Sequence, residues 1–291
     1  MDIRQSPQYV KYMKLIGWET VKTKNGQIFV KKFPLIGSVI KVQRIKPPVP
    51  LLQIEKLAKK HRACLIEIDQ EKLVTSDRES VIRNQRLVAG NFKKYGYKIN
   101  KRPYFPTKTI QIDLNRNEEE IFNSFSEAKR RAVRKAIKNG VTIKEDDDYK
   151  EFLWLKKKSL LEKFVLPIMA EKEVKNLWQA FFPKNAKIIL AYFKNQPVGG
   201  IFLLHYNKVA YYWLAASCKL GKKLFAPTLL VWETLKIAKK MGCQVFDFEG
   251  IYDQRFPVKS WLGFTKFKQG FGGKEIFYPP SLKKFLFPGL T

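Results

Sequence analysis

Cys243-Gln-Val-Phe-Asp-Phe248 is the apolar segment around which the second half of the chain is organised. Its Phe and Val residues predict a short strand that is covered on both faces, as is typical of α/β proteins. The strand is expected to break at Glu249-Gly-Ile251. After a polar loop, Phe264-Thr-Lys-Phe-Lys268 is expected to form a further strand before Gln269-Gly-Phe-Gly-Gly273.

Two carboxylates mark the end of this first strand. Asp247 and Glu249 are two residues apart, so both side chains are expected on one side of the strand. Charged groups at that place are costly unless they are paired, and the carboxyl end of a central strand is where α/β sheets bind ligands. The pair indicates a candidate site, and a solvated strand end is the alternative interpretation.

The segments before Cys243 predict antiparallel strands, then a helix, then the crossover strand. Strands are expected at residues 187–193, 199–205 and 208–215, and a helix at residues 228–241. This order is that of an acyltransferase-type α/β fold of the GNAT class, by analogy of fold alone. Further helices are expected at residues 7–16, 80–95, 117–122, 127–139, 149–164 and 171–182.

The first part of the chain repeats this order of elements. An Asn25-Gly26 turn predicts a hairpin, and a strand, a proline break, a helix and another strand follow within residues 38–68. Two copies of one unit explain the repetition better than chance. We therefore predict an α/β (α+β) fold of two tandem GNAT-like domains, residues 1–107 and 108–291, with mixed sheets flanked by helices. The tail at residues 281–287 is expected to pack back on the first domain, and an acidic membrane surface is its alternative partner.

The helix predicted at residues 127–139 has a narrow apolar stripe and a basic surface. Ala128, Ala132 and Ala136 are four residues apart, which places them on one face. Like charges that cluster on a helix are unfavourable by themselves, so the basic surface indicates an anionic ligand such as tRNA, with a solvated face as the alternative. The basic residues are Arg130, Arg131, Arg134, Lys135 and Lys138.

The composition favours a globular protein with an anionic partner. Among 291 residues, 56 Lys and Arg against 26 Asp and Glu give a net charge of +30, which indicates nucleic acid, a phosphorylated substrate or an acidic membrane face. A lysine-rich proteome is the alternative explanation.

Three separated cysteines and two isolated histidines predict neither a disulfide framework nor a metal site. The first residues lack the apolar core of a signal peptide, so a cytoplasmic protein is expected, free or peripheral at the membrane.

Four stretches taken together resemble the Fem family, the aminoacyl-tRNA-dependent transferases that add amino acids to the peptidoglycan stem peptide. The resemblance covers nearly the whole chain in order and spacing. Because no long heptad pair is present, the chain is similar to the compact members without a coiled-coil arm. The stretches are residues 105–114, the basic helix with Arg134-Lys-Ala-Ile-Lys-Asn-Gly-Val141, Phe225-Ala-Pro227 with its Trp232 helix, and Asp247-Phe-Glu-Gly-Ile251 with Phe267-Lys-Gln-Gly-Phe-Gly-Gly273.

The resemblance implies a transfer site at Phe267 and Lys268, where the lysine stabilises the tetrahedral intermediate. An ammonium beside the developing oxyanion stabilises the transition state more than the ester. Asp247 and Glu249 are candidate proton acceptors, with the substrate's own groups as the alternative.

Three further residues are expected to bind the precursor substrate. Lys11 matches a lysine that contacts nucleotide-sugar phosphates in the compact members, and we add Tyr212 and Arg255. No cofactor is expected beyond aminoacyl-tRNA as co-substrate. The implied acceptor is an amine of a UDP-linked or lipid-linked muropeptide.

The chain departs from the family pattern at two places. The Arg-to-Tyr motif by which compact members hold the nucleotide of their precursor has no match around residues 164–167, and a tyrosine expected after Tyr211-Tyr-Trp213 is Leu214. These departures suit a lipid-linked precursor or another amine.

A CoA-dependent N-acyltransferase of the same fold is the second hypothesis, although Pro227 removes an amide donor from the turn that would hold pyrophosphate. A basic protein that binds nucleic acid or a membrane without catalysis is the third.

Overall fold

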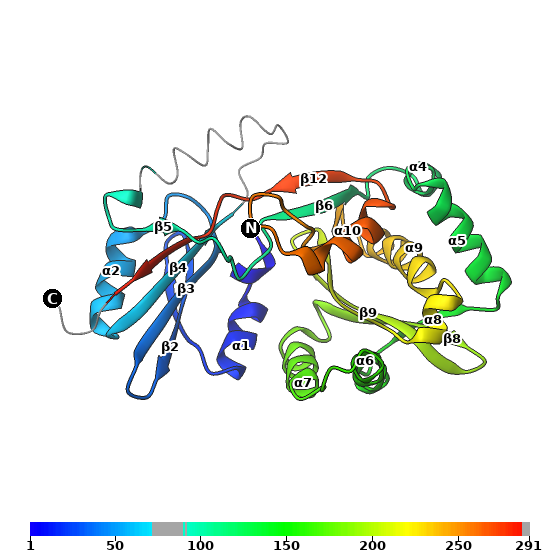
Figure 1. Cartoon of the computed structure of the whole chain (residues 1–291), viewed down its shortest axis with the longest axis horizontal. Coiled ribbons are helices and arrows are strands. Elements are labelled where there is room, and N and C mark those ends of the chain that lie inside the picture. Colours follow the sequence, from blue (N-terminus) through cyan, green and yellow to red (C-terminus); the bar gives the residue numbers. More distant parts are fainter. Residues whose placement is uncertain (72–89, 91, 287–291) are drawn as a thin grey trace. The chain divides into compact units, whose positions relative to one another are not determined.

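The computed structural model of the chain describes residues 1–71, 90 and 92–286 (Figure 1). Contacts divide the chain into two units. Unit 1 comprises Met1–Thr109, Tyr252–Lys259 and Glu275–Thr291, and unit 2 comprises Ile110–Ile251 and Ser260–Lys274. Most of the helix predicted at residues 80–95 lies outside the described residues.

Unit 1 is built on a six-stranded sheet in the order β1-β2-β3-β4-β13-β5, in which β3 and β4 are parallel. The predicted first helix is confirmed, since the Ser6 hydroxyl accepts a hydrogen bond from the Tyr9 amide and Pro7 occupies the first turn. The elements are η1 (Ile3–Gln5), α1 (Pro7–Leu15), β1 (Glu19–Thr23), β2 (Gly26–Phe33), β3 (Gly37–Ile45), α2 (Leu51–Lys60), β4 (Ala63–Gln70), β5 (Lys98–Ile99) and β13 (Leu282–Phe285).

The end of the chain supplies a strand to this sheet. β13 pairs antiparallel with both β4 and β5, so that Leu282 lies opposite Ile68 on one side and Ile99 on the other. Residues 252–259, which were expected in the second domain, group with unit 1. The expected packing of the tail on the first domain is confirmed. Strand pairing explains this return, because a strand at this place satisfies the backbone groups of β4 and β5.

The second sheet has seven strands in the order β12-β6-β11-β10-β9-β8-β7, in which β10 and β11 are parallel. Helix α9 connects these two strands. Unit 2 holds most of β6 and all of β7 to β11, and it ends at Lys274, the first residue of β12. The elements are β6 (Lys108–Asp113), α4 (Glu118–Asn123), α5 (Glu127–Lys138), β7 (Thr142–Asp146), α6 (Lys150–Leu161), α7 (Ala170–Phe181), β8 (Ala186–Phe193), β9 (Gln196–Tyr206), β10 (Val209–Ser217), α8 (Lys219–Lys223), α9 (Ala226–Lys240), β11 (Val245–Asp247), η2 (Lys259–Trp261), α10 (Leu262–Gln269) and β12 (Lys274–Phe277).

The segment predicted as a strand at residues 264–268 is a helix, α10. Phe264, Phe267 and Phe271 follow helical spacing, and the ring of Phe271 packs on Phe267 and on Phe248 with centroids 5.1 and 5.6 Å apart. A short apolar run does not distinguish a strand from a buried helix by itself. Packing of the buried Phe271 against Phe248 and Phe267 favours the helix.

Both units share one order of elements, which is a hairpin, a strand, a helix and a parallel strand. The pairs β3 with β4 and β10 with β11 hold equivalent places. The longest helix in the described part of the chain is α9 with 15 residues, so no coiled-coil arm is present there. Among the same residues, no helix combines the length and apolar character needed to cross a membrane.

Helix α8 packs very closely on β9 at Gly221. A Cβ atom at this position would lie 2.0 Å from the carbonyl oxygen of Val198, a contact that only a backbone shift can relieve. At Gly263, in α10, a Cβ would meet nothing within 4 Å. The two glycines therefore form a matched pair for substitution.

We expect Gly221→Ala to lower the free energy of unfolding by about 1–3 kcal/mol, because the added methyl group overpacks the α8–β9 contact. We expect Gly263→Ala to be neutral or stabilising by about 0.5–1 kcal/mol, since alanine favours a helix. Denaturant unfolding of both variants measures the difference. Equal stabilities would contradict this description of α8.

Candidate functional site

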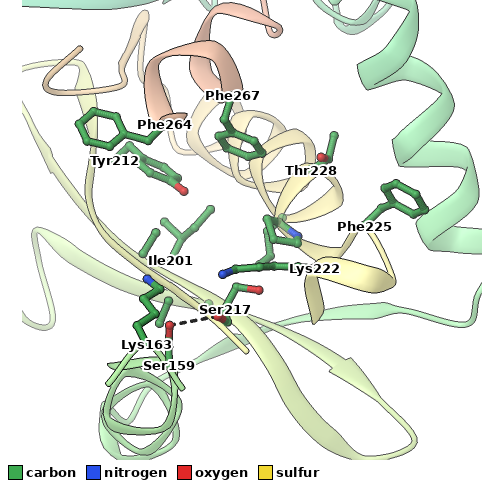
Figure 2. Close-up of a pocket in the computed structure, with 15 residues that line it drawn as sticks. Ser159, Lys163, Ile201, Tyr212, Ser217, Lys222, Phe225, Thr228, Phe264 and Phe267 are labelled. Carbon is green, nitrogen blue, oxygen red and sulfur yellow. Dashed lines mark hydrogen bonds between the residues drawn. The ribbon is translucent and has the colours of Figure 1, made fainter. Parts of the chain in front are cut away.

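A pocket of about 440 Å³ opens in unit 2 beside the end of β10 (Figure 2). The polar side chains of Ser159, Lys163 and Ser217 lie at one side, and aromatic rings lie at the other. Ser159 donates a hydrogen bond of 3.0 Å to the backbone carbonyl of Ser217, which joins α6 to β10. The lining residues are Ser159, Lys163, Gly200, Ile201, Tyr212, Ala215, Ala216, Ser217, Lys222, Phe225, Pro227, Thr228, Leu230, Phe264 and Phe267.

The pocket exists because β10 and β11 separate. The parallel pairing ends where Tyr211 lies opposite Asp247, whereas β10 continues beside β9 to Ser217. A register shift between Tyr212 and Leu214 leaves one extra residue in β10 at this point. Such a bulge bends the strand and redirects its side chains. The crevice beyond the carboxyl end of β11 is the place at which open α/β sheets bind ligands.

The rings of Phe264 and Phe267 project from α10 and form the aromatic end of the pocket together with Tyr212 (Figure 2). Burial raises the pKa of Tyr212, so its hydroxyl stays protonated at neutral pH. The Nζ atom of Lys129, on α5, lies 3.7 Å from the ring centroid of Phe267. Burial lowers the pKa of Lys129 to about 8. Sequence reasoning missed Lys129, although it is four residues before the buried Val133 and thus adjoins the apolar stripe.

Lys268 lies immediately behind the aromatic end of the pocket. Its side chain is buried, and its Nζ donates hydrogen bonds of 2.7 Å to the carbonyl oxygens of Phe248 and Gly250. The same atom lies 4.8 Å from the ring centroid of Phe264 and 5.7 Å from that of Tyr212. Burial lowers the pKa of Lys268 to about 8, against the opposing charges of Glu249 and Asp247. Lys268 is therefore not a solvated strand lysine, nor is it among the residues that line the pocket.

The two carboxylates at the end of β11 have different surroundings. Asp247 is 1% exposed, and its oxygens accept hydrogen bonds from the Gln111 side chain and from the Glu249 amide, both at 2.7 Å. Glu249 is half-buried and has a φ of 62°, so the chain turns at this residue and β11 ends at Asp247. The expected break of the strand at Glu249 is therefore confirmed, and the strand spacing does not decide where the Glu249 side chain points, because Glu249 lies in the turn.

Two ammonium groups meet at the polar end of the pocket. Lys163 follows α6 and Lys222 belongs to α8, and Figure 2 shows both on the side of Ser159 and Ser217. Partial burial and the neighbouring Lys222 hold the pKa of Lys163 below its usual value. Repulsion between two such groups is relieved by an anion. Sequence reasoning missed this pair, because only the fold brings residues 163 and 222 together.

The basic residues of α5 have different surroundings. Arg130 donates hydrogen bonds to the carbonyls of Asn123 and Phe125, and Arg131 pairs with Glu127 at 3.5 Å. The side chains of Arg134, Lys135 and Lys138 are exposed. The Nζ atom of Lys135 lies 5.7 Å from the ring centroid of Phe225, which lines the pocket. The exposed basic row of α5 therefore reaches the mouth of the pocket.

Two predicted substrate-binding residues belong to unit 1 rather than to this pocket. Lys11 is exposed on α1. Arg255 pairs with Asp253 at 2.7 Å and donates hydrogen bonds to the carbonyls of Thr107 and Tyr278. These contacts hold a loop of unit 1 in place. No group of His, Cys, Asp and Glu that could bind a metal occurs among the described residues.

Comparisons with known proteins agree with this architecture. Residues 123–257 match the family described as Acetyltransferase (GNAT) domain. The chain is 28% identical over 167 residues to Lipid II:glycine glycyltransferase of Staphylococcus aureus, a match that covers 50% of this chain and 39% of the relative. The chain thus spans less than half the length of the curated relatives it matches.

Solved structures show the same fold. FemX superposes with a TM-score of 0.77 at 17% identity, over 98% of this chain and 92% of that one. L-PGS from Bacillus licheniformis gives a TM-score of 0.60 at 13% identity, covering 97% and 92%. A tandem GNAT protein from the clavulanic acid biosynthesis pathway gives 0.59 at 10% identity, covering 100% and 97%. The predicted tandem GNAT-like fold is therefore confirmed. The likeness to FemX and the match to Lipid II:glycine glycyltransferase agree with the resemblance to the Fem family.

The lowered pKa of Lys268 predicts a stability difference that depends on pH. The folded pKa of about 8 lies below the unfolded value, so the neutral lysine favours the folded state and this contribution is lost as pH falls through about 8. Between about pH 7 and pH 10, the free energy of unfolding of the wild type should rise by about 2 kcal/mol relative to that of Lys268→Met. Denaturant unfolding of both proteins at the two pH values measures this change. An unchanged difference would mean that the ammonium is hydrated in the folded protein.

Proposed function

We propose that this chain is an aminoacyltransferase that moves an amino acid from aminoacyl-tRNA to an amine of a peptidoglycan precursor stem peptide. The relative in Staphylococcus aureus, whose name states a glycyl transfer to lipid II, supports this proposal. The observation that carries it is the buried ammonium of Lys268 behind the aromatic end of the pocket. The donor is cytoplasmic, so we place the protein in the cytoplasm, in peripheral contact with the membrane that carries a lipid-linked precursor.

The reaction forms an amide bond between the precursor amine and the acyl carbon, and it breaks the ester bond to the tRNA ribose. Negative charge develops on the carbonyl oxygen of the tetrahedral intermediate, where a fixed cation stabilises the transition state more than the ester. Lys268 uses two of its three N–H donors on the Phe248 and Gly250 carbonyls, which fixes the position of the charge. Aromatic rings lie between this charge and the pocket. They screen the electric field of the ammonium less than water would.

The proton that the amine loses ends on the departing ribose oxygen. Asp247 is buried and already accepts hydrogen bonds from Gln111 and Glu249, so its role in this proposal is to position the turn after β11. Glu249, which is half-buried, or the substrate's own groups then carry the proton between amine and ribose.

The basic surface suits a nucleic acid donor. In this proposal the exposed side chains of Arg134, Lys135 and Lys138 contact tRNA phosphates, and Lys163 with Lys222 receives a phosphate near the acylated end. The aromatic end, close to Lys268, then holds the aminoacyl ester.

Replacing Arg134, Lys135 and Lys138 together by alanine should weaken tRNA binding. It should also reduce the slope of log affinity against log salt by about 2, since each lost phosphate contact removes about 0.7–0.9. The matched control replaces the exposed Lys56, Lys59 and Lys60 of α2 by alanine. Filter binding across a salt series measures both effects. An equal loss in the two variants would assign binding to the overall charge instead of α5.

A transfer assay with mixed radiolabelled aminoacyl-tRNAs and a lipid-linked precursor, followed by mass analysis of the product, tests the reaction itself. Lys268→Met should lower the transfer rate by about 10²–10³-fold, since it removes a cation that stabilises the oxyanion. Lys266→Met, an exposed lysine on the same helix, should transfer at the wild-type rate. Transfer by Lys268→Met at the wild-type rate, with tRNA binding intact, would exclude this role for the lysine.

A CoA-dependent N-acyltransferase is the second candidate, and the match of residues 123–257 to the GNAT domain favours it. The start of α9 argues against it, because Pro227 lacks an N–H group at the place where backbone amides hold pyrophosphate. Calorimetry with acetyl-CoA and longer acyl-CoAs distinguishes the two. Micromolar binding would favour the second candidate.

A further inference from the structure

Apolar side chains crowd the connection between α6 and α7, residues 162–169, which we call the α6–α7 loop. Phe164 is 97% exposed, Leu166 is 73% exposed and Ile168 is 77% exposed. Single exposed apolar residues are ordinary, but a contiguous group indicates a contact surface. Leu161, Val165 and Met169 extend the group on both sides.

The backbone places Phe164 in a position that normally belongs to glycine. Helix α6 ends with hydrogen bonds from the Val165 amide to the Leu160 carbonyl and from the Phe164 amide to the Leu161 carbonyl, at 3.0 and 2.9 Å. This is a Schellman motif, and its left-handed residue is Phe164 with a φ of 59°. A phenylalanine there is strained in the backbone and fully exposed in the side chain. Neither feature stabilises unit 2 by itself. Both suit a side chain that contacts a binding partner.

Lysines surround this loop. Lys163 belongs to it, and Lys158 and Lys172 flank it in sequence. The Glu162 carboxylate accepts a hydrogen bond of 2.6 Å from the Lys219 amide, which brings α8 with its exposed Lys219, Lys222 and Lys223 to the same place.

The nearby carboxylates on α7 are already paired. Glu171 pairs with Lys157 at 2.6 Å, and Glu173 pairs with Lys156 at 2.8 Å. The charge left around the loop is therefore positive. Trp154 on α6 is 48% exposed, with the Lys158 Nζ atom 4.9 Å from its ring centroid. Exposed aliphatic and aromatic side chains bordered by lysines are typical of segments that lie in the surface of an anionic bilayer.

We propose that the α6–α7 loop docks unit 2 on the surface of an anionic phospholipid bilayer. The apolar side chains enter the boundary between headgroups and acyl chains, and the lysines outside the pocket, Lys158, Lys172, Lys219 and Lys223, contact the acidic headgroups. Lys163 belongs to the loop and also lines the pocket, so docking holds the pocket mouth next to the lipid surface. The tail is the weaker candidate for this role, because β13 is paired on both of its edges.

Vesicle sedimentation with the full chain tests this proposal without any aminoacyl-tRNA, so its outcome is separate from that of the transfer reaction. The probes are vesicles of phosphatidylcholine alone and vesicles that also contain phosphatidylglycerol. Wild type should bind the second kind, and less so at high salt. Leu166→Ser with Ile168→Ser should weaken this binding by about tenfold or more, because two large apolar side chains no longer leave water. Both side chains are exposed, so folding is retained.

The matched control is Leu35→Ser with Ile36→Ser in unit 1. These residues form another exposed apolar turn, at 108% and 64% exposure, with Lys32 and Arg62 nearby. The control should bind like wild type. The proposal is overturned if wild type binds neither kind of vesicle, or if the loop variant binds like wild type. Loss of binding in the control variant alone would also overturn it and would assign docking to the β2–β3 turn.

Discussion

The ammonium of Lys268 and the two carbonyls that it contacts fix the end of β11 to α10. Past Asp247 the chain turns at Glu249, and the carbonyls of Phe248 and Gly250 on either side of that residue point at one Nζ atom. Removing a cation from water is costly, and two charge-assisted hydrogen bonds, nearby carboxylates and aromatic faces offset that cost. The lowered pKa of Lys268 shows that the compensation is incomplete. An incompletely compensated cation is suited to stabilise negative charge that arises during a reaction.

The two units share one topology and differ in how far their parallel strands stay paired, and this difference leaves room for the pocket in unit 2. In unit 1 the parallel strands stay paired past a register shift between Val42 and Ile45, so that Ile45 lies opposite Gln70 and the Glu71 amide donates to the Ile45 carbonyl. In unit 2 the parallel pairing covers three residues, and β10 then continues beside β9 with a bulge after Tyr212. The same order of elements thus gives a closed sheet edge in one unit and a pocket in the other. The side chains that line the pocket then determine its chemistry.

Local signals in the sequence predicted most elements correctly. The Ser6-Pro7 start of α1, the Asn25-Gly26 turn and the stripe of α5 each depend on neighbouring residues, so the chain itself specifies them. The errors share a different cause, which is tertiary contact. Burial of Phe271 against Phe248 makes α10 a helix, and the contacts of residues 252–259 group that loop with unit 1. The resemblance to the Fem family pointed to Phe267 and Lys268, but the burial of Lys268 and the meeting of Lys163 with Lys222 require the folded chain.

The proposed reaction requires that the pocket receives an acyl group whose carbonyl oxygen comes under the influence of Lys268. A crystal structure with a stable aminoacyl-adenosine analogue, in which an amide replaces the ester, would locate that oxygen. We expect the amide carbonyl at the aromatic end of the pocket, between Tyr212 and Phe264, with its oxygen directed toward the Lys268 ammonium. An analogue bound outside this pocket, or bound there with its carbonyl oxygen directed toward Lys163 and Lys222, would contradict this expectation.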